Sequence, residues 1–273
     1  MNKNGVVLLL IFIFAGLCLM FTGRVMGADR TLYFGNGYRL EAVSGLVFRN
    51  SATSGEIVSV DKRQLPSFTE IDIRIVDMDI QFQPADNYGI ELSYTADRDI
   101  TWEVKKGKLI VKDNTEIFQQ VTINANSRAY DSYAVVYCPT DKIDKIELNT
   151  VSGKIEIEGY HAKSIVAETV SGEITLRDCE SDRQRVKTVS GGIRQENCGS
   201  DDIYLESVSG SIYHETEFQA NLHNIRLSSV SGSMLVNGEP VSRSDYDNWG
   251  DRNAPYKLSA ETVSGRIELW FND

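Results

Sequence analysis

Apolar and polar residues alternate through much of the chain, in short runs such as KIEL at 145–148 and KIEI at 154–157. A period of two residues is typical of a β-strand that buries one face. Residues 146–273 contain no segment with the three-to-four-residue period of a helix. The alternation therefore predicts an all-β protein.

A Val-Ser-Gly triplet recurs along this pattern with intervals of 19, 19, 19, 22 and 33 residues. The triplets begin at Val151, Val170, Val189, Val208, Val230 and Val263. Four residues after each Val lies an apolar residue: Ile155, Ile174, Ile193, Ile212, Met234 and Ile267. Repetition at about 20 residues predicts stacked units that bury a shared core. We expect a parallel β-solenoid, with two strands in each coil and a spacing of about 4.8 Å between equivalent strands.

The repeated triplet is best interpreted as a corner of the coil. Gly permits a positive φ or a close approach of the backbone, and Ser can hydrogen-bond to the backbone of its own coil or of the next. A catalytic serine is a single residue activated by a single base. Six equivalent serines indicate a structural ladder, and the sequence predicts no catalytic residue.

Two residue pairs depart from the apolar columns. Gln195 and His214 fall where most other coils have Ile, Leu or Val, and we expect a buried polar pair there, with a functional pair as the alternative. Cys179 and Cys198 both lie nine residues after their Val. Parallel stacking would place their Cα atoms about 5 Å apart, so a disulfide is a candidate whose formation depends on side-chain direction.

The longest interval predicts an inserted loop near residues 237–256. It contains Tyr246, Trp249 and Tyr256 among polar residues, which suits contact with a partner. The alternative is that these aromatic residues pack over the last coils. No ligand spacing for a metal is recognisable, and the sequence predicts no cofactor.

The N-terminus predicts export. Residues 1–28 combine Lys3, an apolar run and a small-residue exit, which indicates a signal peptide or an N-terminal membrane anchor. The remainder should lie outside the cytoplasm, secreted or associated with the cell envelope. The net charge is −11 and no basic run occurs, which argues against nucleic acid as a partner. Membrane contact is expected only through an uncleaved N-terminal segment.

Residues 29–145 show strand patterns without the regular repeat, and we interpret them as an irregular β-rich N-terminal part or cap before the solenoid at 146–273. A separate small β domain is the alternative. The strand run FTEIDIRIVDMDIQF at 68–82, followed by serial TVSG units, resembles the bacterial putative adhesin family over roughly residues 65–273. The resemblance implies a β-solenoid in a surface or envelope setting, and it carries over no functional residue.

The sequence thus favours a non-enzymatic extracytoplasmic protein that presents a rigid scaffold for adhesion or interaction with an envelope protein or glycan. Two alternatives stay open. One is an envelope-stress sensor or regulator. The other is a carbohydrate-active enzyme built on a β-solenoid, which would need carboxylates clustered in space.

Overall fold

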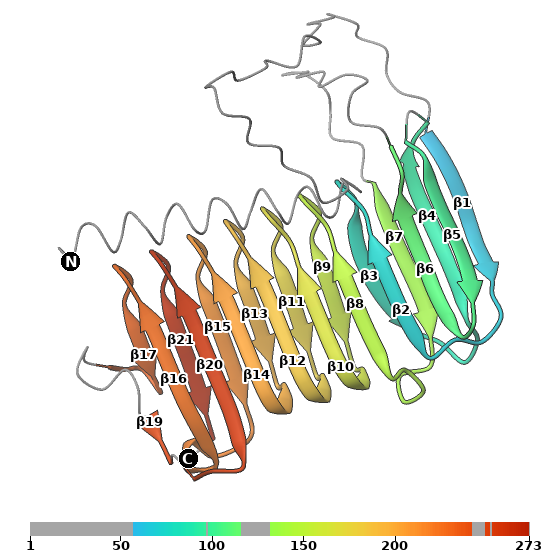
Figure 1. Ribbon diagram of the computed structural model, residues 1–273. Helices are drawn as coiled ribbons and strands as arrows, with labels where there is room; N and C mark the ends of the chain where they lie inside the picture. Colours follow the sequence, from blue (N-terminus) through green and yellow to red (C-terminus); the bar gives the residue numbers. More distant parts are fainter. Residues whose placement is uncertain (1–56, 97, 116–131, 242–248, 252, 273) are drawn as a thin grey trace, which may run out of the picture.

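The computed structural model describes residues 57–96, 98–115, 132–241, 249–251 and 253–272. These residues form two sheets whose strands alternate along the chain and stack in a row (Figure 1). The predicted N-terminal segment 1–28 and Tyr246 lie outside the described residues. Within the described part, no helix is long and apolar enough to cross a membrane.

We call the 11-stranded sheet sheet A and the 10-stranded sheet sheet B. Sheet A contains, in spatial order, β1 (Ile57–Gln64), β4 (Gly89–Thr95), β7 (Tyr133–Cys138), β3 (Asp79–Pro84), β9 (Ile155–Glu158), β11 (Ile174–Arg177), β13 (Ile193–Glu196), β15 (Ile212–Thr216), β21 (Ile267–Phe271), β17 (Met234–Val236) and β18 (Glu239–Pro240). Sheet B contains β19 (Trp249–Gly250), β16 (His223–Ser229), β20 (Tyr256–Thr262), β14 (Gly199–Ser207), β12 (Glu180–Thr188), β10 (His161–Glu168), β8 (Lys145–Asn149), β2 (Glu70–Arg74), β6 (Lys108–Asp113) and β5 (Ile100–Lys105). A short 3-10 helix, η1, spans Ala220–Leu222.

Each coil places one strand in sheet B and the next strand in sheet A. Equivalent strands pair in parallel and in register, so that Ile165 faces Ile146 in sheet B and Ile174 faces Ile155 in sheet A. These inward columns are almost completely buried. Each buried Ile or Leu contributes about 1.5–3 kcal/mol, which favours stacking of units that are too small to fold alone. The predicted all-β parallel solenoid is confirmed.

The Val-Ser-Gly corner brings the backbones of successive coils into close contact. A Cβ built on Gly172 would lie 1.8 Å from the carbonyl oxygen of Gly153, and one on Gly191 would lie 1.7 Å from that of Gly172. Neither glycine is among the residues with positive φ. Glycine is therefore required at this corner for close approach, the second of the two reasons considered from the sequence.

Hydroxyl groups on either side of the corner join neighbouring coils. Thr188 Oγ1 accepts a hydrogen bond from the Gly191 N–H (3.1 Å) and donates one to the Gly172 carbonyl (3.3 Å). Ser190 Oγ donates to the Val170 carbonyl in the preceding coil (3.2 Å). The serines of the triplet are thus rungs of a ladder, as predicted.

The stack extends to chain segments before residue 145. β2 and β3 pair in parallel with β8 and β9, and Val76, Asp77 and Met78 occupy the corner that Val-Ser-Gly occupies later. β6 and β7 still pair in parallel with β2 and β3. Beyond them the pairing becomes antiparallel, in β7 with β4, in β4 with β1 and in β6 with β5. These outer strands cover one end of the solenoid (Figure 1).

The final two coils do not stack in chain order. β20 and β21 pair in parallel with β14 and β15 on one side and with β16 and β17 on the other. The last coil in the sequence therefore lies between the two that precede it (Figure 1). The 33-residue interval contains β18 and β19, which pair with the outer edges of β17 and β16, and then β20, which lies on the inner side of β16.

The predicted polar pair is present within the core and continues to a third residue. His214 Nδ1 lies 2.9 Å from Gln195 Oε1, and Gln195 Nε2 donates to Gln184 Oε1 at 2.6 Å. Gln184 Nε2 donates to the carbonyls of Cys179 and Gly199. All three side chains are fully buried. Burial lowers the pKa of His214 to about 3, so the imidazole is neutral.

Candidate functional site

The site lies where the second strand of one coil turns into the first strand of the next. Gly159, Asp178 and Asn197 occupy equivalent positions at this turn and have φ values of 75°, 50° and 51°. Such positive φ values bend the chain sharply, and Gly, Asn and Asp tolerate them best. Each bend turns the following side chain into the core, and in two of the three coils the residue after that, His161 or Glu180, is exposed. We refer to this edge as the return corner.

The buried side chains at the return corner are Tyr160, Cys179 and Cys198. They anchor the bends, because each is held between the two sheets. The Tyr160 hydroxyl donates to the Cys138 carbonyl at 3.1 Å, and burial raises the pKa of the Cys138 thiol to about 12. The polar residues that follow are thereby fixed on a rigid edge.

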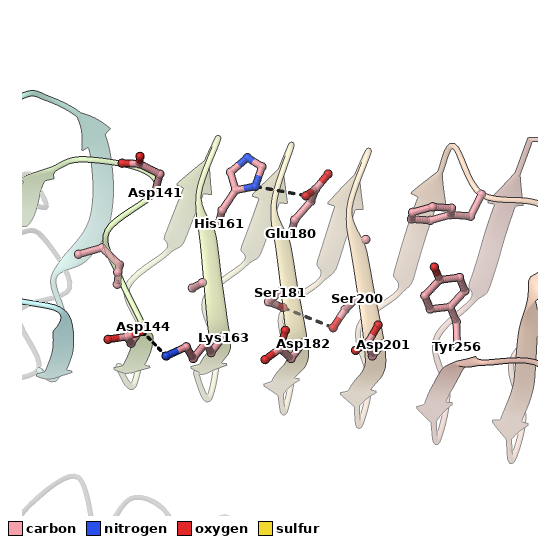
Figure 2. A pocket seen from close by; sticks show the side chains of 14 residues that line it. Asp141, Asp144, His161, Lys163, Glu180, Ser181, Asp182, Ser200, Asp201 and Tyr256 are labelled. Atoms are coloured by element: carbon pink, nitrogen blue, oxygen red, sulfur yellow. Dashed lines mark hydrogen bonds and ion pairs between the residues drawn. The ribbon is translucent and has the colours of Figure 1, made fainter.

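These polar residues line a groove of about 470 Å³ that runs across several coils (Figure 2). One row along the groove contains one residue from each successive coil: Asp144, Lys163, Asp182, Asp201 and Tyr256. A second row contains His161 and Glu180, and a third contains Ser181 and Ser200. The parallel register therefore converts sequence positions 19 residues apart into adjacent side chains.

The groove is acidic and internally paired. Lys163 Nζ lies 2.7 Å from Asp144 Oδ1, which lowers the pKa of Asp144 and raises that of Lys163. His161 Nδ1 lies 3.2 Å from Glu180 Oε2, and the hydroxyls of Ser181 and Ser200 are 3.4 Å apart. Five carboxylate side chains line the groove, those of Asp141, Asp144, Glu180, Asp182 and Asp201. The same wall contains one lysine and one histidine.

An aromatic cluster closes one end of the groove. The ring centroids of Phe218 and Tyr256 are 5.3 Å apart, and those of His223 and Tyr256 are 5.4 Å apart. Phe218 is 38% exposed, and its ring packs where a side chain on Gly199 would clash, with a hypothetical Cβ 2.8 Å from Phe218 Cε2. Phe218 belongs to the segment that carries the three additional residues of the 22-residue interval.

Tyr256 and Trp249, two of the residues predicted to bind a partner, lie in different places. Tyr256 lines the groove and stacks within the aromatic cluster. Trp249 lies in β19, whose backbone pairs with β16 at Ile225. The partner-binding role of these residues stays a prediction. The other lining residues were not identified from the sequence, although most of them stand one to three residues after Tyr160, Cys179 or Cys198.

Cys179 and Cys198 lie in successive coils at the return corner, as the repeat predicted. Both are thiols in the structure, and they donate to the backbone carbonyls of Ile157 (3.6 Å) and Leu176 (3.5 Å), respectively. The proximity of the two thiols lowers the pKa of Cys179 and raises that of Cys198. The disulfide between them stays a prediction. Among the described residues, no group of three or more His, Cys, Asp or Glu side chains is arranged to hold a metal ion.

A family model and several solved structures are similar to this chain. The family model described as Toastrack DUF4097 matches residues 68–273. A solved structure of a putative adhesin from Bacteroides fragilis is 12% identical, with 79% of this chain and 98% of that chain covered and a TM-score of 0.47. A putative cell adhesion protein from Clostridium sporogenes is also 12% identical, with 79% and 100% covered and a TM-score of 0.48. A search of curated proteins gives no match.

Proposed function

The chain belongs to the Toastrack DUF4097 family, and from this premise and the geometry of the return corner we propose a non-enzymatic scaffold function outside the cytoplasm. The protein presents a rigid solenoid in the cell envelope for adhesion or interaction, and the groove at the return corner contacts its partner. The exported location rests on the sequence pattern of residues 1–28.

One observation carries the proposal: the groove displays one side chain per coil in a straight row, on backbone fixed by continuous parallel pairing. A preformed surface of this kind loses little conformational entropy on binding. The hydroxyls of the repeated triplet bind backbone carbonyls of adjacent coils, which fits a structural role for them better than a catalytic one.

The proposal is tested by retention of the purified protein on isolated bacterial envelopes. The groove variant combines Glu180→Gln, Asp182→Asn and Asp201→Asn, which preserve side-chain size and remove three negative charges. A matched control combines Glu156→Gln, Glu158→Gln and Glu173→Gln, three exposed carboxylates away from the groove. We expect the groove variant to lose retention at least tenfold and the control to match the wild type.

Equal retention of both variants would contradict the groove as the contact surface. Turnover of a cell-wall glycan panel that is abolished by a single carboxylate substitution would contradict the non-enzymatic assignment and favour the enzyme alternative. A changed envelope-stress response on deletion of the gene, without loss of retention, would favour the sensor alternative.

A further inference from the structure

A second hollow lies on the outer face of sheet A, at the ends of β15 and β21. It has a volume of about 480 Å³ and is lined by side chains that include Asn197, Tyr213, Glu215, Glu217, Trp270 and Asn272. This volume is within the range of small-ligand sites. The hollow is separate from the groove at the return corner, because the segment at 217–218 passes between them: Glu217 lines the hollow and Phe218 lines the groove.

Trp270 is the distinctive residue of this hollow. Its side chain is 37% exposed on the outward face of the sheet. The residues at the same position in the preceding coils of the stack are all charged, namely Glu158, Arg177, Glu196 and Glu215. An aromatic residue thus replaces a charged one at the coil where the hollow lies, and it presents a partly exposed ring with a polar N–H to that hollow.

The ring of Trp270 is held in place from two sides. Its Nε1 donates a hydrogen bond to Glu268 Oε1 at 3.0 Å. Asn237 and Gly238 form the two-residue turn between β17 and β18, both with positive φ, and a Cβ on Gly238 would lie 3.4 Å from Trp270 Cη2. The ring thus packs against the turn and remains exposed elsewhere, so it is positioned before any ligand arrives.

Tyr213 supplies a second aromatic ring in the neighbouring coil. Its hydroxyl donates to Glu215 Oε2 at 2.6 Å, and the Arg194 guanidinium lies 4.5 Å from its ring centroid. Glu215 is paired directly with Trp270 across the strands. With strands about 4.8 Å apart and residues about 3.3 Å apart along a strand, the Cα atoms of Tyr213 and Trp270 are separated by roughly 8 Å.

This combination fits one class of ligand. A sugar ring has an apolar face of C–H groups that stacks on an aromatic ring, and hydroxyls around its rim that hydrogen-bond to carboxylate and amide groups. Glu215, Glu217, Asn197 and Asn272 supply those groups at the edge of the hollow. Arg194 already occupies the position over Tyr213 that a cationic ligand would use. We propose that this hollow binds a neutral sugar unit of a glycan.

The site exists because the last coil is out of chain order. β21 lies beside β15, so Trp270 meets Glu215 although the two are 55 positions apart in the chain. Had the coils stacked in chain order, the neighbour of β15 would be β17. Val236 at the end of β17 is equivalent to Leu269, so Asn237 would stand at the position of Trp270. The inserted coil therefore places Trp270 at the hollow that Tyr213 also lines.

The test is isothermal titration of the purified protein with three soluble tetrasaccharides: chitotetraose, cellotetraose and maltotetraose. We expect at least one of them to bind. Trp270→Ala should raise the Kd at least tenfold, and Trp270→Tyr should raise it less. Glu158→Ala, at the same position of a distant coil, should leave Kd unchanged. Circular dichroism and thermal melting of each variant establish that it is folded.

Absence of binding by all three saccharides, or equal binding by wild type and Trp270→Ala, would overturn the proposal. Binding of tetralysine that depends on Trp270, without saccharide binding, would overturn it in favour of a cationic ligand. The carboxylate variants of the return-corner groove should retain saccharide binding, so failure of the scaffold proposal and failure of this one are distinguishable.

Discussion

Gly191 faces the carbonyl oxygen of Gly172 so closely that a Cβ at residue 191 would lie 1.7 Å from that oxygen. Gly191→Ala is therefore expected to push two coils apart and to lower stability by about 3 kcal/mol or more, at the upper end of the cost of overpacking. Urea unfolding, followed by circular dichroism, measures the shift in midpoint.

The adjacent residue provides the control for this substitution. A Cβ on Gly192 would meet its nearest atom, the Ser211 carbonyl oxygen, at 3.7 Å, which is ordinary contact, and Gly192 does not have a positive φ. Gly192→Ala should be neutral or stabilising by up to about 1 kcal/mol. Similar midpoints for the two variants would contradict the close-approach explanation of the repeated glycine.

Thr188 and Ser190 are expected to differ although both hydrogen-bond across coils. Thr188 is 3% exposed and joins the Gly191 N–H to the Gly172 carbonyl. Thr188→Val keeps the shape and leaves buried backbone groups unpaired, at a cost of about 2 kcal/mol. Ser190 is exposed, so water can replace its bond, and Ser190→Ala should cost less than about 1 kcal/mol. A larger loss for Ser190→Ala in urea unfolding would contradict this order.

Buried His214 makes stability depend on pH. Desolvation lowers its pKa to about 3 in the folded protein, whereas an unfolded chain has a histidine pKa of about 6.5. Between these values the unfolded state binds more protons, so stability is lost as the pH falls below about 6.5, by up to about 1.4 kcal/mol per pH unit.

His214→Leu tests this dependence, because Leu occupies the same inward column in Leu176 and Leu269. Urea unfolding between pH 6 and 4 should show a less steep loss of stability in the variant than in the wild type. The other titrating groups are the same in both proteins, so the difference between the two slopes reports on His214. The partly buried His223 has its pKa lowered as well and is present in both proteins. Parallel pH profiles would show that His214 does not titrate as proposed.

The sequence predicted the coils well and their order less well. The inward residues, the corner and the Gln195–His214 pair all follow from a 19-residue period, because equivalent positions in a parallel stack must be neighbours. The period contains no information on which of the two last coils packs against β14 and β15. Both have the same apolar columns, so either would satisfy the same burial.

The return-corner groove was missed for a related reason. Only part of it repeats: the Cys-X-Ser-Asp run at 179–182 recurs at 198–201, whereas other positions differ from coil to coil, as His161 and Glu180 do. They become one surface only through the parallel register. Trp270 was missed because its aromatic neighbour Tyr213 is brought close by the out-of-order coil, which chain spacing does not predict.

Cys179 and Cys198 are expected to form a disulfide when the folded protein is oxidised. Their positions in successive coils place the Cα atoms about 5 Å apart, within the range of disulfides. The proximity of the two thiols lowers the pKa of Cys179 and raises that of Cys198, so Cys179 is the thiol that ionises first. Thiol counting after mild oxidation should show loss of two thiols from the set Cys138, Cys179 and Cys198. Cys198→Ser should abolish that loss. Three free thiols after oxidation of the wild type would contradict the bridge.

Removal of the last coil should release two coils rather than one. β16 pairs in parallel only with β20 among the described strands, and β17 only with β21. A chain ending at residue 241 lacks both partners, so we expect amide protons in residues 223–236 to exchange as rapidly as in an unfolded segment, while those in β10 to β13 stay protected. Hydrogen exchange with mass spectrometry measures this directly. Persistent protection of residues 223–236 would mean that β16 and β17 can pair with β14 and β15 once the intervening coil is absent, and that the order of stacking is set by competition between two similar coils.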